Sequence, residues 1–112
     1  MKLGKVRVPW RDIFEVRWVM LRSSILGFIC GVLPGAGASL GSFMTYVTEK
    51  GIAGEKGGFG TGVPKGVAAP EAGNNAAAGG ALVPMLTLGV PGSGTTAVLL
   101  AVLVTLNITP GP

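Results

Sequence analysis

Two short motifs interrupt the uncharged, apolar parts of this chain, and they constrain its fold more than any other feature. The first is Pro34-Gly-Ala-Gly-Ala-Ser39 and the second is Pro91-Gly-Ser-Gly-Thr-Thr96. Proline lacks an N–H group and glycine has a weak helical preference, so each motif should break a helix. In lipid, such a break is costly unless the freed backbone groups line a cavity or contact protein. The pair of breaks therefore predicts a binding site for a polar ligand, although a single break of this kind is often only a kink.

The distribution of charge indicates a membrane protein built from helices. Charged residues make up 12% of the chain, against about 25% in ordinary globular proteins. None lies in residues 23–48 and none follows Glu71, so the uncharged C-terminal stretch exceeds the roughly 20 residues that cross a bilayer. The fold class that we expect is an all-α, integral membrane helical bundle segment, with discontinuous or re-entrant helices broken at the Pro-Gly motifs.

The chain divides into two regions on this basis. Residues 1–22 are basic and contain both tryptophans, so we expect a short amphipathic helix on the cytoplasmic face or at the membrane interface. Basic residues flank 23–48 on both sides, which favours a hairpin that returns to its starting side over a tilted span. The second region, a transmembrane segment, would cover 23–112: a re-entrant hairpin or span at 23–48, a polar Gly-rich loop at 49–66, and a span plus a broken helix at 70–106, where Ala69-Pro70-Glu71 starts the helix.

The expected ligand follows from the backbone. A helix that begins inside the membrane leaves its first N–H groups unpaired, and these groups and the positive end of the helix dipole attract an anion. Glycines allow close approach to the backbone, and hydroxyl groups donate further hydrogen bonds. Two adjacent asparagines in embedded sequence need polar partners; bonding between helices and a role in binding substrate or ion are equally good interpretations. The candidate substrate-binding residues are Gly35, Gly37, Ser39, Asn74, Asn75, Gly92, Ser93, Gly94, Thr95 and Thr96.

Several other functions lack the residues that they require. The sequence has no histidine, a single cysteine (Cys30), no paired carboxylates at useful spacing and no nucleophile–base pair, so we expect neither an enzyme nor a metal site. Gly35-x-Gly37 fails the dinucleotide pattern because Leu40 occupies the third glycine position. No separate soluble domain accompanies the basic N-terminal residues, and we expect no nucleic-acid partner.

Three stretches of the chain resemble the TctA family, the large membrane subunit of tripartite tricarboxylate transporters. They run from Gly31 to Lys50, from Gly66 to Pro84 with the element Ala-Pro-Glu-Ala-Gly-Asn-Asn, and from Leu88 to Leu100 with the element Pro-Gly-Ser-Gly-Thr-Thr. The resemblance covers about residues 22–112. Family members are several times longer, so the chain is similar to an internal fragment. Family members often carry an acidic residue where this chain has Lys65.

The resemblance implies a multi-pass protein of the bacterial inner (cell) membrane that belongs to a secondary active transporter for tricarboxylates or related carboxylates. An ion gradient would drive uptake, with H+ or Na+ as the coupling ion and no cofactor. The implied partners are a periplasmic solute-binding protein, a small membrane subunit, the remaining half of the transporter, the lipid bilayer and the carboxylate itself. A stand-alone structural or regulatory membrane peptide without transport activity is the alternative.

Overall fold

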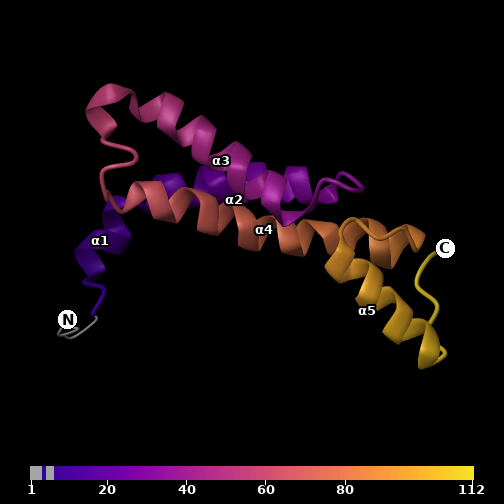
Figure 1. The fold of residues 1–112 in the computed structure, drawn as a ribbon. Helices are drawn as coiled ribbons and strands as arrows, with labels where there is room; N and C mark the ends of the chain where they lie inside the picture. Colours follow the sequence, from indigo (N-terminus) through magenta and orange to yellow (C-terminus); the bar gives the residue numbers. More distant parts are fainter. Residues whose placement is uncertain (1–3, 5–6) are drawn as a thin grey trace.

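The computed structural model describes residue 4 and residues 7–112, and these residues form helices joined by turns (Figure 1). The described part contains no strand, which confirms the all-α prediction. Residues 1–3 and 5–6 of the predicted basic segment lie outside the described residues. The helices in chain order are α1 (Trp10–Glu15), α2 (Arg17–Val32), α3 (Gly37–Ala53), the short 3-10 helix η1 (Glu55–Gly57), α4 (Lys65–Leu88) and α5 (Gly94–Thr105).

Helix α4 is the central element of the structure. α2 and α3 form a hairpin that turns at the first Pro-Gly motif, and α4 packs along both helices of this hairpin (Figure 1). α5 contacts α4 and projects away from the other helices, which gives the molecule extents of 50 × 34 × 23 Å. The turn at Pro34-Gly35 therefore folds α2 and α3 against each other, whereas a re-entrant hairpin or a span over 23–48 stays a prediction.

Small residues allow the helices of this three-helix unit to pack closely. Gly27 and Gly31 of α2 face Gly73 and Ala77 of α4, and a Cβ atom added at Gly31 would lie 2.6 Å from the Ala77 Cα atom. Both pairs are spaced by four residues, the spacing at which small residues let two helix backbones approach each other. Gly41 of α3 also faces α4, so all three helices meet through positions with little side-chain volume.

No helix ends at the boundary predicted between residues 22 and 23. The chain is interrupted at Val16, and α2 then runs without interruption from Arg17 to Val32. α3 continues into the predicted loop and ends at Ala53, and the C-cap residue Gly54 has a positive φ of 68°, which is accessible to glycine. The irregular part of the predicted loop over 49–66 is therefore shorter than its sequence composition suggests.

α4 begins at Lys65, about one turn before the predicted start at Ala69-Pro70. Pro70 lies in the second turn of this helix, where its missing N–H group leaves the carbonyl oxygen of Gly66 without the usual helical donor. Proline is a common helix-start residue because the first N–H groups have no helical partner in any case. A helix does form over Ala69-Pro70-Glu71, as predicted, but it begins about one turn earlier, at Lys65.

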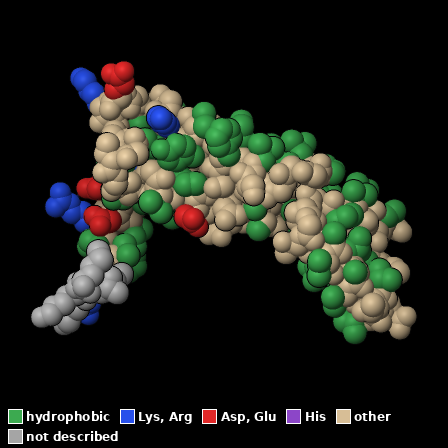
Figure 2. All heavy atoms as spheres, viewed as in Figure 1, with side chains coloured by type: hydrophobic (Ala, Val, Ile, Leu, Met, Phe, Trp, Pro, Cys, Tyr) green, Lys and Arg blue, Asp and Glu red, His purple; other side chains and the backbone are tan. Residues whose placement is uncertain are grey.

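Large apolar side chains lie mainly on the outside of the molecule, whereas the buried residues are mostly small (Figure 2). Charged side chains gather at the end that carries α1 and the glycine-rich loop, and none is seen over α5 (Figure 2). Among the helices of the described part, none is both long enough and apolar enough to traverse a bilayer. The membrane crossings expected from the sequence therefore remain a prediction.

Candidate functional site

The two Pro-Gly breaks lie in contact with each other. The backbone N–H of Gly35 donates a hydrogen bond to the carbonyl oxygen of Gly92, at an N···O distance of 3.1 Å. Gly35 and Gly37 have φ angles of +83° and +72°, in the left-handed region that glycine adopts without strain. The structure thus joins the turn before α3 to the turn before α5, although the two motifs lie far apart in the sequence.

A cavity of about 430 Å³ lies where α3 and α5 begin. We call it the helix-start cavity. Its far wall comes from Ala78, Ala81 and Leu82 of α4, and no charged side chain lines it. Seven of the candidate residues line it: Gly35, Gly37, Ser39, Ser93, Gly94, Thr95 and Thr96.

Backbone amides are free at both helix starts around this cavity. No side chain caps α3, and the N–H groups of Gly37 and Ala38 have no hydrogen-bond partner among the described residues. The N–H groups of Gly94 and Thr95, at the start of α5, are unpaired within the same residues. Such groups, together with the positive ends of two helix dipoles, favour a bound anion. The cavity therefore has the backbone electrostatics of an anion site without a cationic side chain.

Ser93 and Thr96 hold the start of α5 through a reciprocal cap. Ser93 Oγ accepts a hydrogen bond from the Thr96 N–H at 3.2 Å, and Thr96 Oγ1 accepts one from the Ser93 N–H at 2.9 Å. Thr96 Oγ1 also donates to the Ser93 carbonyl oxygen at 3.0 Å, and the residue is only 4% exposed. Sequence reasoning treated Thr96 as a ligand donor and missed this cap, although Ser-x-x-Thr resembles the known capping-box pattern. The hydroxyl group of α5 that remains free is that of Thr95, which makes no side-chain hydrogen bond in the described part.

Ser93→Ala is expected to destabilise α5 by about 1 kcal/mol, because loss of an N-cap side chain typically costs this much. Hydrogen exchange at the amides of the first turn of α5 should accelerate, and mass spectrometry of the full-length protein can measure the change. Thr95→Ala is the matched control in the same turn, since its hydroxyl group takes no part in the cap. Equal acceleration in both variants would contradict a capping role.

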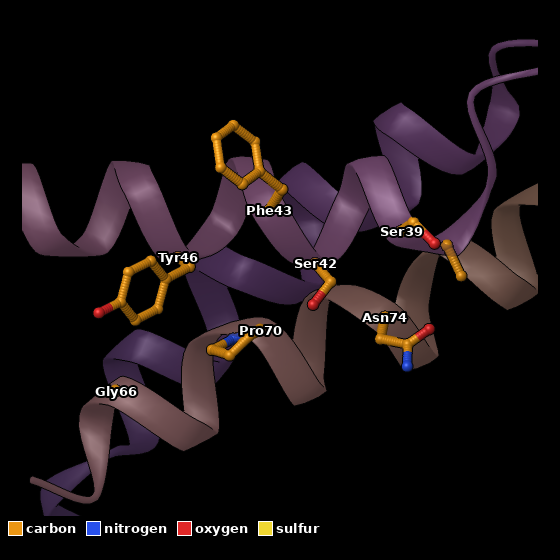
Figure 3. A pocket seen from close by; sticks show the side chains of 8 residues that line it. Ser39, Ser42, Phe43, Tyr46, Gly66, Pro70 and Asn74 are labelled. Atoms are coloured by element: carbon orange, nitrogen blue, oxygen red, sulfur yellow. The ribbon is translucent and has the colours of Figure 1, made fainter. Parts of the chain in front are cut away.

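Three candidate residues lie outside the helix-start cavity. Asn74 lines a neighbouring cavity of about 540 Å³ between α3 and α4 (Figure 3). Asn75 is exposed and lines neither cavity, so the structure does not bring it to the predicted site. Gly92 is buried, and its carbonyl oxygen accepts the hydrogen bond from Gly35, so its position supports the turn. Ser39 is the candidate that lines both cavities.

An ion pair that sequence reasoning missed joins the other end of the α2–α3 hairpin. The Arg22 Nε and Nη2 atoms each donate to one carboxylate oxygen of Glu49, at 2.8 Å. The Glu49 side chain is 3% exposed and the Arg22 side chain is 46% exposed. The two residues lie at similar sequence distances from the break at Pro34-Gly35. A hairpin folded at that break brings them together, so the signal was present in the sequence.

Two helix starts converge on one uncharged cavity in this structure. Broken helices whose starts converge on an uncharged cavity are the elements from which secondary transporters build solute sites. The chain belongs to the TctA family: the model of the "Tripartite tricarboxylate transporter TctA family" matches residues 1–112.

Two curated relatives from Agrobacterium vitis support this membership. An uncharacterized 52.8 kDa protein in the TAR-I ttuC' 3' region is 43% identical over 101 residues, which cover 90% of this chain and 20% of the relative. An uncharacterized protein in the TAR-II ttuC' 3' region is 44% identical over 86 residues, covering 77% of this chain and 36% of the relative. The chain therefore spans about a fifth and about a third of the lengths of these relatives. No solved structure matches the chain.

Proposed function

We propose that this chain is a segment of the large membrane subunit of a secondary active transporter that takes up tricarboxylates or related carboxylates. The observation that carries the proposal is the pair of helix starts with free amides around one uncharged cavity. Carboxylate oxygens accept hydrogen bonds from such amides, and family membership supports a carboxylate as the solute. The uncharged lining suits a site that must also release its ligand.

We assign specific roles to the groups that remain free in the helix-start cavity. The amides of Gly37 and Ala38 would bind one carboxylate, and those of Gly94 and Thr95 would bind another. The hydroxyl groups of Ser39 and Thr95 would donate the remaining hydrogen bonds. Ser93, Thr96 and Gly92 then act indirectly, since they hold the two turns in place.

We further place the segment in the bacterial inner membrane, within a longer multi-pass polypeptide. The many exposed large apolar side chains suit contact with lipid or with further helices. The remaining half of the transporter, a small membrane subunit and a periplasmic solute-binding protein would complete the assembly, with H+ or Na+ as the coupling ion. A stand-alone structural peptide is less well supported, because the matching family is a transporter family.

Gly94→Ala tests the helix-start site with little risk to folding. A Cβ atom added at Gly94 meets nothing within 4 Å, so the methyl group should obstruct the neighbouring amides without displacing protein atoms. In the full-length subunit we expect the KM for citrate uptake to rise about tenfold, which corresponds to about 1.4 kcal/mol of lost binding.

Gly79→Ala is the control, because this exposed glycine of α4 also has nothing within 4 Å of an added Cβ atom and lines neither cavity. Gly92→Ala would be harder to interpret, because its Cβ atom would lie 3.3 Å from Ala81. An unchanged KM in Gly94→Ala at matched expression would contradict the assignment of this cavity to the carboxylate.

A further inference from the structure

The helix-start cavity adjoins the cavity between α3 and α4, because Ala38 and Ser39 line both. We call the combined depression the α3–α4 groove. On the α4 side, most of its lining residues follow at intervals of four, which places them along one ridge of the helix that is inclined to the helix axis. These residues are Gly66, Pro70, Asn74, Ala78 and Leu82, and Ala81 also lines the end at the helix-start cavity.

Polar groups that lack protein partners occur along this groove. The side chains of Ser39, Ser42 and Asn74 make no side-chain hydrogen bond in the described part of the chain. The Ser42 hydroxyl group points toward α4 and Pro70, whereas the Phe43 ring points away from α4 (Figure 3). No charged side chain lines the groove, so its polar groups form a series of weak binding sites for a polar solute and no strong one.

Exposed lysines and acidic residues both lie where the groove ends. Its far end lies at Gly66, directly after the exposed Lys65, and the Tyr46 ring packs there edge-on against Phe59 of the glycine-rich loop, with ring centroids 5.4 Å apart. Lys50 lies in α3 and Lys56 in η1, and side chains of both charge signs gather at this end (Figure 2). The ammonium group of Lys65 can attract an anion that leaves the groove.

We propose that the α3–α4 groove is the route by which the carboxylate leaves the helix-start cavity toward the side of the membrane that carries the glycine-rich loop. The free amides of the two helix starts hold the anion. Ser39, Ser42 and Asn74 solvate it in succession, and the lysines receive it at the loop end. Movement along such a path requires that each site bind weakly enough to release its ligand, which uncharged groups allow. This inference rests on the proposed transport function.

The test uses single cysteines in the full-length subunit, in a Cys30→Ala background. Ser42→Cys and Asn74→Cys report on the groove, and Thr95→Cys reports on the helix-start cavity. Lys56→Cys marks the side of the loop, and Met44→Cys is the control, an exposed residue of α3 that lines neither cavity. A membrane-impermeant, sulfonate-bearing thiol reagent is applied from each side of sealed vesicles, with and without citrate.

We expect Ser42→Cys and Asn74→Cys to react from the side that labels Lys56→Cys, and citrate to slow both reactions several-fold. Citrate should leave the reaction of Met44→Cys unchanged. If citrate protects Thr95→Cys while the groove cysteines are unreactive or unprotected, the groove is not the route and the transport site stands. If citrate protects none of the three positions, the proposed transport site itself is wrong.

Ser42→Leu adds a kinetic measurement that separates passage from binding. The larger apolar side chain should obstruct the groove and lower the maximal rate of citrate uptake several-fold. The citrate concentration that half-protects Thr95→Cys should stay the same, because position 42 lies outside the helix-start cavity. An unchanged uptake rate in Ser42→Leu would overturn the proposed route.

Discussion

Gly31→Ala is expected to destabilise the three-helix unit by about 3 kcal/mol or more, the upper end of the range for overpacked cores. A Cβ atom at position 31 would lie 2.6 Å from the Cα atom and 2.7 Å from the carbonyl carbon of Ala77. These are backbone atoms of α4, so no side-chain rotation can relieve the clash, and α2 would have to move away from α4. The thermal stability of the full-length subunit in detergent should fall, and its yield in membranes should fall with it.

Two further glycine substitutions in α4 serve as positive and negative controls. Gly80→Ala should reproduce the loss, because its Cβ atom would lie 3.1 Å from the backbone nitrogen of Val32 and closer still to the Phe28 carbonyl oxygen. Gly79→Ala should leave stability unchanged or raise it by up to about 1 kcal/mol, since alanine has the higher helix propensity and no atom lies within 4 Å. Similar effects at positions 79 and 80 would show that α2 and α4 do not pack as the structure describes.

The helix starts that follow the two Pro-Gly motifs could be predicted from the sequence, because they depend on local chemistry, whereas the interruption at Val16 and the end of α3 could not. Pro34-Gly35 and Pro91-Gly92 stop helices wherever the rest of the chain lies, and α3 and α5 begin within a few residues of these motifs. The start of α4 was less certain, since a proline fits both the first turn of a helix and, with one lost hydrogen bond, a later turn.

The contact between the two breaks could not be predicted in the same way. The hydrogen bond from Gly35 to Gly92 depends on how α4 and α5 are placed against the hairpin, and no local signal encodes that placement. Helix geometry alone, however, predicts that the two asparagines face different directions. Adjacent residues of a helix point about 100° apart, so Asn74 and Asn75 could not both face one site.

The ion pair at the open end of the α2–α3 hairpin is expected to respond unequally to removal of its two partners. Arg22→Met leaves the almost fully buried Glu49 carboxylate without a partner, and loss of one partner of a buried pair typically costs about 3–5 kcal/mol. Glu49→Met leaves an arginine whose side chain is nearly half exposed and can stay hydrated, so the loss should be about 1 kcal/mol. Thermal unfolding of the full-length subunit measures both effects.

The double variant Arg22→Met with Glu49→Met decides what the ion pair contributes. Arg22→Met should destabilise the protein because the Glu49 carboxylate is then buried without a partner. In that case the double variant should recover most of the lost stability, because apolar side chains of similar size replace buried ion pairs with little net change in stability. The pair between Arg11 and Glu15 is the control: its atoms lie 3.6 Å apart and both side chains are more than half exposed. Arg11→Ala should therefore cost less than about 1 kcal/mol. If Arg22→Met is as mild as Arg11→Ala, Glu49 must be hydrated in the full-length protein, and the hairpin must be held by its close contacts with α4 alone.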